Sequence, residues 1–326
     1  MNESIVQAIR KRLHPASRVL IVSHIRPDGD AVGSLLGFGL ALREAGKDVV
    51  MVLSDGVPPT LRFLEGVQLI DTQPEGTFDC SIVVDCSDLP RVGDALGDIS
   101  RPDINIDHHI TNLNFARENL VVVEAAATAE ILAGLLPELG YPLTPPVASA
   151  LLTGMITDSI GFRTTNVTPQ TMCMAAELMK AGASLPVLYE QALVQRSFEA
   201  ARLWGVGLLG LQRENGLVWT SITQDEKKAI NYPGRDDADL VNVLSSITDA
   251  DVAVIFLEQP GGKIKISWRA KPGFDVAQIA LYFGGGGHQA AAGAEVVGSL
   301  QEVQDKVLEA TRAIISGEKV GSENTG

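Results

Sequence analysis

Residues 18–34 read RVLIVSHIRPDGDAVGS, and the expected fold follows from the order of its parts. The apolar run from Arg18 to Ser23 predicts a short buried strand that ends in a polar loop. A helical pattern follows from about Ala31 to Ala45. Gly46 is suited to end that helix, because glycine readily adopts a left-handed conformation.

Apolar strands and helices alternate through the first half of the chain. Short, wholly apolar strands that are separated by helices indicate a parallel sheet with both faces covered. In open sheets of this kind, ligands bind beyond the carboxyl ends of the strands. Further strands are expected at 48–53, 80–84 and 104–107, and helices at 128–139, 146–155 and 168–180.

The pattern changes near residue 185, which predicts a second, smaller domain. Strands are expected at 217–222, 252–257 and 263–268, with a helix near 237–248 and a hairpin turn at 259–262. This mixture predicts an α/β domain with a mixed sheet. We expect a first domain at 1–184, a helical linker at 185–214, the second domain at 215–316 and a disordered tail at 317–326.

The charge balance limits the class of ligand. The chain has 26 Lys+Arg and 40 Asp+Glu, which gives a formal net charge of −14. Long double-stranded nucleic acid is held by basic surfaces, so we do not expect it as a ligand of this acidic chain. A small anionic ligand that binds through metal cations is compatible with the negative charge. Three cysteines without a CxxC motif, no signal-peptide core and no membrane-spanning apolar stretch predict a cytoplasmic protein without a membrane anchor.

Aspartate and histidine residues gather at the ends of the predicted elements. Taken singly, each aspartate is more often a helix cap or a loop residue, and two adjacent histidines are equally often loop residues. Four aspartates and two histidines together are too many for one tetrahedral zinc ion, and they suit two cations with a bridging carboxylate. Imidazole ligands favour Mn²⁺, because Mg²⁺ prefers oxygen. The residues are His24, Asp28, Asp30, Asp85, His108 and Asp158, with Asp107 and His109 beside them.

A glycine run distinguishes the second domain. Residues 284–293 read GGGGHQAAAG. The backbone N–H groups of such a run can contact an anion, with His288 as a further donor. The alternative interpretation of the run is a flexible linker. Arg269, at the end of a predicted strand, is a candidate for holding phosphate, and a plain surface arginine is equally compatible.

The order of these motifs resembles the DHH phosphoesterase superfamily, which is named for the sequence found here at residues 107–109. The HxxxDxD motif at 24–30, Asp85 and Asp158 match the other signatures of the family in order. The glycine run resembles that of the DHH-associated domain, DHHA1. The resemblance extends from about residue 19 to 297. The short two-domain architecture is similar to the nanoRNase and pAp phosphatase group, where pAp is 3′-phosphoadenosine 5′-phosphate.

The resemblance implies a role for each residue and two Mn²⁺ ions per active site, with Mg²⁺ or Co²⁺ as substitutes. One ion would be held by His24, Asp28 and Asp85, and the other by Asp30, Asp85, His108 and Asp158. Asp85 would bridge the two ions, and His109 would be a catalytic donor to the scissile phosphate or the leaving oxygen. The substrate would be held by Arg269, Gly286, Gly287 and His288.

The resemblance also implies an activity. The protein would hydrolyse oligoribonucleotides of two to five nucleotides, including pApA, to mononucleotides, and pAp to AMP. Alternatives are an exopolyphosphatase or pyrophosphatase, an exonuclease for longer strands, and a protein that binds metal and nucleotide without turnover. Members of the group are often homodimers, and no pattern in this sequence decides the oligomeric state.

Overall fold

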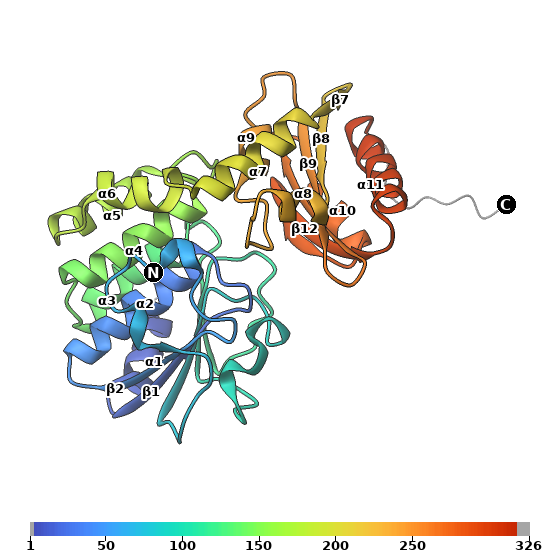
Figure 1. Ribbon diagram of the computed structural model, residues 1–326. Helices are drawn as coiled ribbons and strands as arrows, with labels where there is room; N and C mark the ends of the chain where they lie inside the picture. Colours follow the sequence, from blue (N-terminus) through green and yellow to red (C-terminus); the bar gives the residue numbers. More distant parts are fainter. Residues whose placement is uncertain (1–2, 318–326) are drawn as a thin grey trace. The chain divides into compact units, whose positions relative to one another are not determined.

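The computed structural model describes residues 3–317 and divides into two compact units, Met1–Gln195 and Arg196–Gly326 (Figure 1). The division falls inside the expected linker, whose boundaries stay a prediction. The tail expected at 317–326 lies, except for its first residue, outside the described residues. Within the described part of the chain, no helix has the length and apolar character needed to cross a membrane.

The first unit contains the predicted parallel sheet. Its six strands run in the order β3-β2-β1-β4-β5-β6, and all neighbours are parallel. The strand order reverses between β1 and β4, and ligands bind at such a reversal point in α/β proteins. The strands are β1 (Arg18–Val22), β2 (Asp48–Val52), β3 (Ile70–Asp71), β4 (Cys80–Val84), β5 (Ile104–Asp107) and β6 (Glu118–Val121).

Two of these strands were not predicted, for a local reason. β3 has only two residues, and β6 buries one residue of four, so neither has the apolar run that indicates a buried strand.

The two faces of the first sheet are covered differently. Helices α1 to α4 bury one face in the largest apolar cluster of the molecule, and α2 packs closely on α4. The short helix η3 and neighbouring loops cover the other face. The helices are α1 (Glu3–Leu13), α2 (Gly29–Glu44), η1 (Pro59–Leu61), η2 (Val67–Leu69), η3 (Pro90–Leu96), α3 (Thr128–Leu139), α4 (Pro145–Asp158), α5 (Pro169–Lys180), α6 (Leu185–Tyr189) and η4 (Glu190–Val194).

The second unit contains the predicted mixed sheet, in the order β11-β12-β10-β9-β8-β7. Strands β8 and β9 are parallel, and the other pairs are antiparallel. Helices α10 and α11 pack on one face, and α7 and α9 on the other (Figure 1). The elements are α7 (Phe198–Leu209), β7 (Gln212–Glu214), β8 (Leu217–Ile222), α8 (Gln224–Ala229), α9 (Leu240–Leu244), β9 (Val252–Gln259), β10 (Lys263–Ala270), α10 (Val276–Tyr282), β11 (Gly286–His288), β12 (Ala291–Val297) and α11 (Leu300–Ile315).

The structure corrects one expectation in this unit and excludes one of the alternatives. The helix expected near 237–248 is only the five-residue α9, because Asp239 before it has a left-handed backbone with φ 63°. The glycine run is not a flexible linker, since Gly286–His288 forms β11 and pairs with β12. A side chain at Gly287 would place its Cβ 2.5 Å from the Ala291 carbonyl oxygen, so glycine permits this close pairing.

Candidate metal centre

The centre of the first sheet gathers the side chains that the sequence singled out. Strands β1, β4 and β5 are neighbours, so their carboxyl ends lie at one edge of the sheet. The first turn of α2 and the last residue of α4 contribute the remaining carboxylates. α4 extends to Asp158, three residues further than predicted. The side chains brought together are those of His24, Asp28, Asp30, Asp85, His108, His109 and Asp158.

Asp85 lies at the middle of this group. Its Oδ2 is 3.6 Å from His24 Nε2, and its Oδ1 is 3.8 Å from both His108 Nε2 and His109 Nδ1. The residue is 2% exposed and has a left-handed backbone with φ 53°. Thr128 donates its hydroxyl to Asp85 Oδ1 at 3.0 Å. A carboxylate with one oxygen on each side of the cluster is suited to bridge two cations.

The donor atoms form overlapping sets, each within 4.8 Å. One set is His24, Asp28 and Asp85, and a second is Asp30, His108 and Asp158. A third set joins Asp85 to the two adjacent histidines. Asp85 and His108 each belong to two sets, so they connect the two halves of the cluster.

The imidazoles are turned for metal ligation. His24 Nδ1 lies 2.8 Å from the Ile25 carbonyl oxygen, and His108 Nδ1 lies 3.2 Å from the Ala125 carbonyl oxygen. A carbonyl only accepts, so each Nδ1 carries the proton and each Nε2 directs a lone pair at the carboxylates. Lone pairs and carboxylate oxygens that face one another at 3.4–3.9 Å form a donor set that fits divalent cations.

The electrostatics of the cluster also favour cations. Burial and the nearby carboxylates raise the pKa of Asp30 well above its ordinary value. Burial, together with Asp28 and Asp85, raises the pKa of Asp158 to about 7, although His108 opposes this. Burial alone favours neutral Asp85, but the surrounding imidazoles hold its pKa far below the usual range. Bound cations would relieve this concentration of carboxylates.

Two aspartates use their oxygens for different contacts. Asp28 Oδ1 accepts from the N–H groups of Asp30 and Ala31 and caps α2, while its Oδ2 lies 3.9 Å from His24 Nε2. The cap and the ligand interpretations of Asp28 are therefore compatible. Asp30 accepts from the Thr128 and Ala129 N–H groups at 2.6 and 3.0 Å, so the first turn of α3 holds it in place.

His109 is held by a separate pair of residues. Its Nδ1 donates to Asp107 Oδ1 at 2.7 Å, and Asn112 donates to Asp107 Oδ2 at 2.6 Å. Burial lowers the pKa of His109, but Asp107 and Asp85 outweigh it and raise the pKa to about 9. The contact with Asp107 therefore favours the protonated form of His109 and orients its ring.

Sequence reasoning missed Thr128 and Asn112. Thr128 lies 43 residues from Asp85 along the chain, and no motif links them. The position of Asn112, three residues after His109, was a weak indication that it belongs to the site.

The predicted substrate residues lie in the second unit. The register places Arg269 opposite Ala291, which is in turn opposite His288 on β11. Gly286 and Gly287 belong to the same edge strand. Arg269 donates from Nε to Asn242 Oδ1 at 2.8 Å and is part-buried, unlike a plain surface arginine.

Sequence comparison identifies the family. The DHH family, N-terminal domain, matches residues 18–155, and the DHHA1 domain matches residues 227–317. The chain is 34% identical over 300 residues to the bifunctional oligoribonuclease and PAP phosphatase NrnA of Thermus thermophilus, covering 90% of this chain and 89% of that protein. The chain belongs to the DHH phosphoesterase family.

Solved structures share the fold of this chain. An exopolyphosphatase-related protein from Bacteroides fragilis has a TM-score of 0.86 at 25% identity, over 96% of this chain and 98% of that chain. The fold is also similar to RecJ of Thermus thermophilus in complex with Mn²⁺, with a TM-score of 0.54 at 14% identity over 97% of this chain and 55% of that one. The DHH and DHHA1 assignments predicted from the motifs are confirmed.

Proposed function

We propose that this DHH-family protein is a metal-dependent hydrolase that converts oligoribonucleotides of two to five nucleotides to mononucleotides, and pAp to AMP. The observation that carries the proposal is the position of Asp85 between His24 on one side and His108 and His109 on the other. The similarity to a protein named for both activities supports this choice of substrates.

The metal ligands are proposed from the donor sets. His24, Asp28 and Asp85 would hold one Mn²⁺, and Asp30, Asp85, His108 and Asp158 would hold the second. Such ions, when bound, make water a nucleophile at neutral pH and neutralise charge on the phosphoryl oxygens.

The residues around the ligands prepare the site for a phosphoester. Thr128 fixes the Asp85 carboxylate, and the first turn of α3 fixes Asp30. His109, oriented by Asp107, would donate to a phosphoryl oxygen or to the leaving oxygen. In the second unit, Arg269, Gly286, Gly287 and His288 are proposed to hold the substrate.

A substrate panel tests the proposal. The protein is incubated with Mn²⁺ and pAp, a diribonucleotide, pyrophosphate, polyphosphate or a labelled 24-mer, and kcat/KM is measured for each. We expect the highest values for pAp and the diribonucleotide. A highest value for polyphosphate or pyrophosphate would instead support the exopolyphosphatase or pyrophosphatase alternative. Stoichiometric nucleotide binding without product would contradict any hydrolase.

A further inference from the structure

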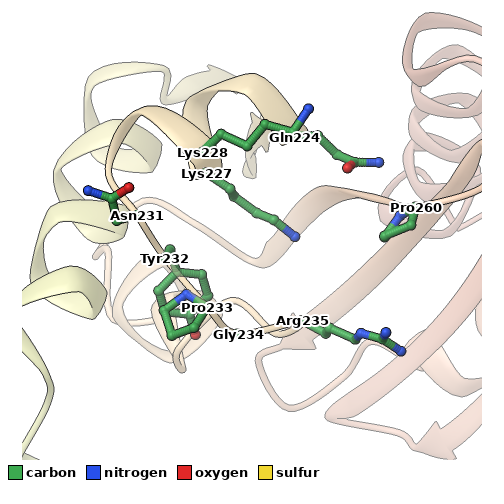
Figure 2. A pocket seen from close by; sticks show the side chains of 9 residues that line it. All are labelled: Gln224, Lys227, Lys228, Asn231, Tyr232, Pro233, Gly234, Arg235 and Pro260. Carbon is green, nitrogen blue, oxygen red and sulfur yellow. The ribbon is translucent and has the colours of Figure 1, made fainter.

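The second unit contains a basic hollow that the proposed hydrolysis does not use. It has a volume of about 510 Å³ and lies beside α8 (Figure 2). Three of its nine lining residues are cations, and none carries a carboxylate, although the whole chain has a net charge of −14. The lining residues are Gln224, Lys227, Lys228, Asn231, Tyr232, Pro233, Gly234, Arg235 and Pro260.

The hollow is formed by the way α8 ends. Asn231 has a left-handed backbone with φ 56°, and the Tyr232 N–H donates to the Lys227 carbonyl oxygen at 3.0 Å. This reversal turns the following loop back beside the helix. Figure 2 shows the Lys227 side chain extending from α8 into the space between the loop that ends at Arg235 and Pro260.

The end of β9 holds the Lys227 side chain and the backbone of Arg235 in position. Lys227 Nζ donates to the Glu258 carbonyl oxygen at 3.2 Å, and the Gln259 side chain donates to the Arg235 carbonyl oxygen at 2.9 Å. Lys227 is only 8% exposed, whereas Arg235 is exposed. Lys227 is therefore a fixed cation of the hollow, and the loop that carries Arg235 is fixed beside it.

Among the nearby carboxylates, Asp225 pairs with the lining residue Lys228 at 3.2 Å, whereas Asp236 and Glu258 accept from donors other than Lys227 and Arg235. Asp236 accepts from the Tyr232 hydroxyl, and Glu258 Oε2 accepts from the Gln224 N–H at 2.9 Å. Within residues 3–317, neither Lys227 nor Arg235 forms an ion pair. Burial lowers the pKa of Lys227, and although Asp236 opposes this, the positive charges of Lys265 and Arg235 add to it. An anion in the hollow would stabilise these cations.

We propose that this hollow binds the phosphate of a nucleotide, through residues that belong neither to the proposed metal ligands nor to the proposed substrate residues Arg269, Gly286, Gly287 and His288. Its volume lies in the range of small-molecule sites, roughly 300–1,000 Å³. The planar guanidinium of Arg235 suits two phosphate oxygens, and the Lys227 ammonium supplies a point charge. Tyr232, Pro233 and Pro260 add apolar surface that a base or ribose could contact.

Calorimetric titration of the full chain in EDTA tests the site without hydrolysis. The probes are AMP, inorganic phosphate and the pentanucleotide of adenylate. We expect wild-type protein to bind at least one probe, and Arg235→Gln and Lys227→Met each to weaken that binding about tenfold or more. Lys306→Gln is the matched control. It also removes one positive charge, but Lys306 is an exposed lysine of α11 that does not line the hollow.

The probes distinguish the source of the phosphate. If the two variants bind AMP or inorganic phosphate more weakly than the wild type does, the hollow is a site for a free ligand. If they bind only the pentanucleotide more weakly, it is a site for an oligonucleotide phosphate. No binding by wild type, or unchanged affinity for every probe in Arg235→Gln, would overturn the proposal. Lys227→Met is interpreted only with an unaltered circular dichroism spectrum. Hydrolysis with Mn²⁺ is assayed separately, so failure of the proposed function is recognised independently.

Discussion

Asp85 combines an unusual backbone with the central position among the donors. A left-handed backbone is tolerated best by Gly, Asn and Asp, so Asn is the substitution that keeps the local conformation. Losing a residue that only orients a metal ligand costs about 10–100-fold in metal affinity or activity, and loss of a shared ligand should cost more.

Asp85→Asn should therefore lower Mn²⁺-dependent kcat/KM by more than about 100-fold while the protein stays folded. The measurement is the rate with pAp, alongside a circular dichroism spectrum that shows an intact fold. Retention of full activity would contradict the bridging role.

Thr128 acts through Asp85 and is a positioning residue. Thr128→Val keeps the shape of the buried side chain and the backbone N–H to Asp30, but removes the hydroxyl donor to Asp85. We expect Mn²⁺ affinity to fall about 10–100-fold. Calorimetry of Mn²⁺ binding measures this loss directly, and Thr128→Ser, which restores a hydroxyl, should recover most of the affinity. Equal affinity of the Val variant and wild type would exclude the positioning role.

Metal binding should depend on pH because the free site holds protons. The pKa of Asp158 is raised to about 7, so this carboxyl is protonated below that pH. Burial lowers the pKa of His24, but Asp85 and Asp28 outweigh it and raise the pKa above 6.5. A cation must displace these protons, so Mn²⁺ affinity should fall as pH decreases from 8 to 6. Calorimetry in two buffers of different ionisation enthalpy should detect proton release, and pH-independent affinity would refute this.

At the scale of elements, the close contact between α2 and α4 positions both ends of the site. A Cβ at Gly33 would lie 2.5 Å from the Ala150 carbonyl oxygen and 2.9 Å from the Gly154 N. Because backbone atoms meet the added carbon, α2 and α4 could accommodate it only by moving apart. That movement would shift Asp30 on α2 relative to Asp158 on α4.

Gly33→Ala should accordingly destabilise the first unit by about 1–3 kcal/mol and weaken Mn²⁺ binding. Urea denaturation measures the first effect. Gly205→Ala in α7 is the control: a Cβ there meets nothing within 4 Å, so the variant should be neutral or more stable. A Gly33 variant as stable as wild type would show that the two helices adjust without cost.

For the molecule as a whole, the metal centre should affect the stability of the folded chain. The carboxylates that gather at the sheet edge repel one another, and this repulsion opposes folding in the absence of cations. Ions that bind only the folded chain should therefore stabilise it.

Removing metal with EDTA should lower the melting temperature of the chain. Mn²⁺ at about 100 times its Kd contributes about 2.7 kcal/mol, which corresponds to roughly 5–10 °C for a unit of this size. Differential scanning calorimetry measures the shift, and Asp85→Asn should show a much smaller one. An identical melting temperature with EDTA and with Mn²⁺ would argue against the centre.

The central strands β1, β4 and β5 and the donor residues that follow them could be predicted from the sequence alone. Short, mostly apolar runs of four or five residues and the polar residues at their ends are local patterns, so they need no knowledge of the fold. The family motifs were recognisable for the same reason.

The way in which distant residues share the site became visible only in the folded chain. The strand order, the contact of Asp30 with a helix almost a hundred residues later, and the pairing of the glycine strand with β12 depend on how the chain packs. The basic hollow depends on it too, because Lys227 and Arg235 are held by the end of β9, more than twenty residues away. Long-range contacts are set by packing and register, and these leave no periodic trace in the sequence.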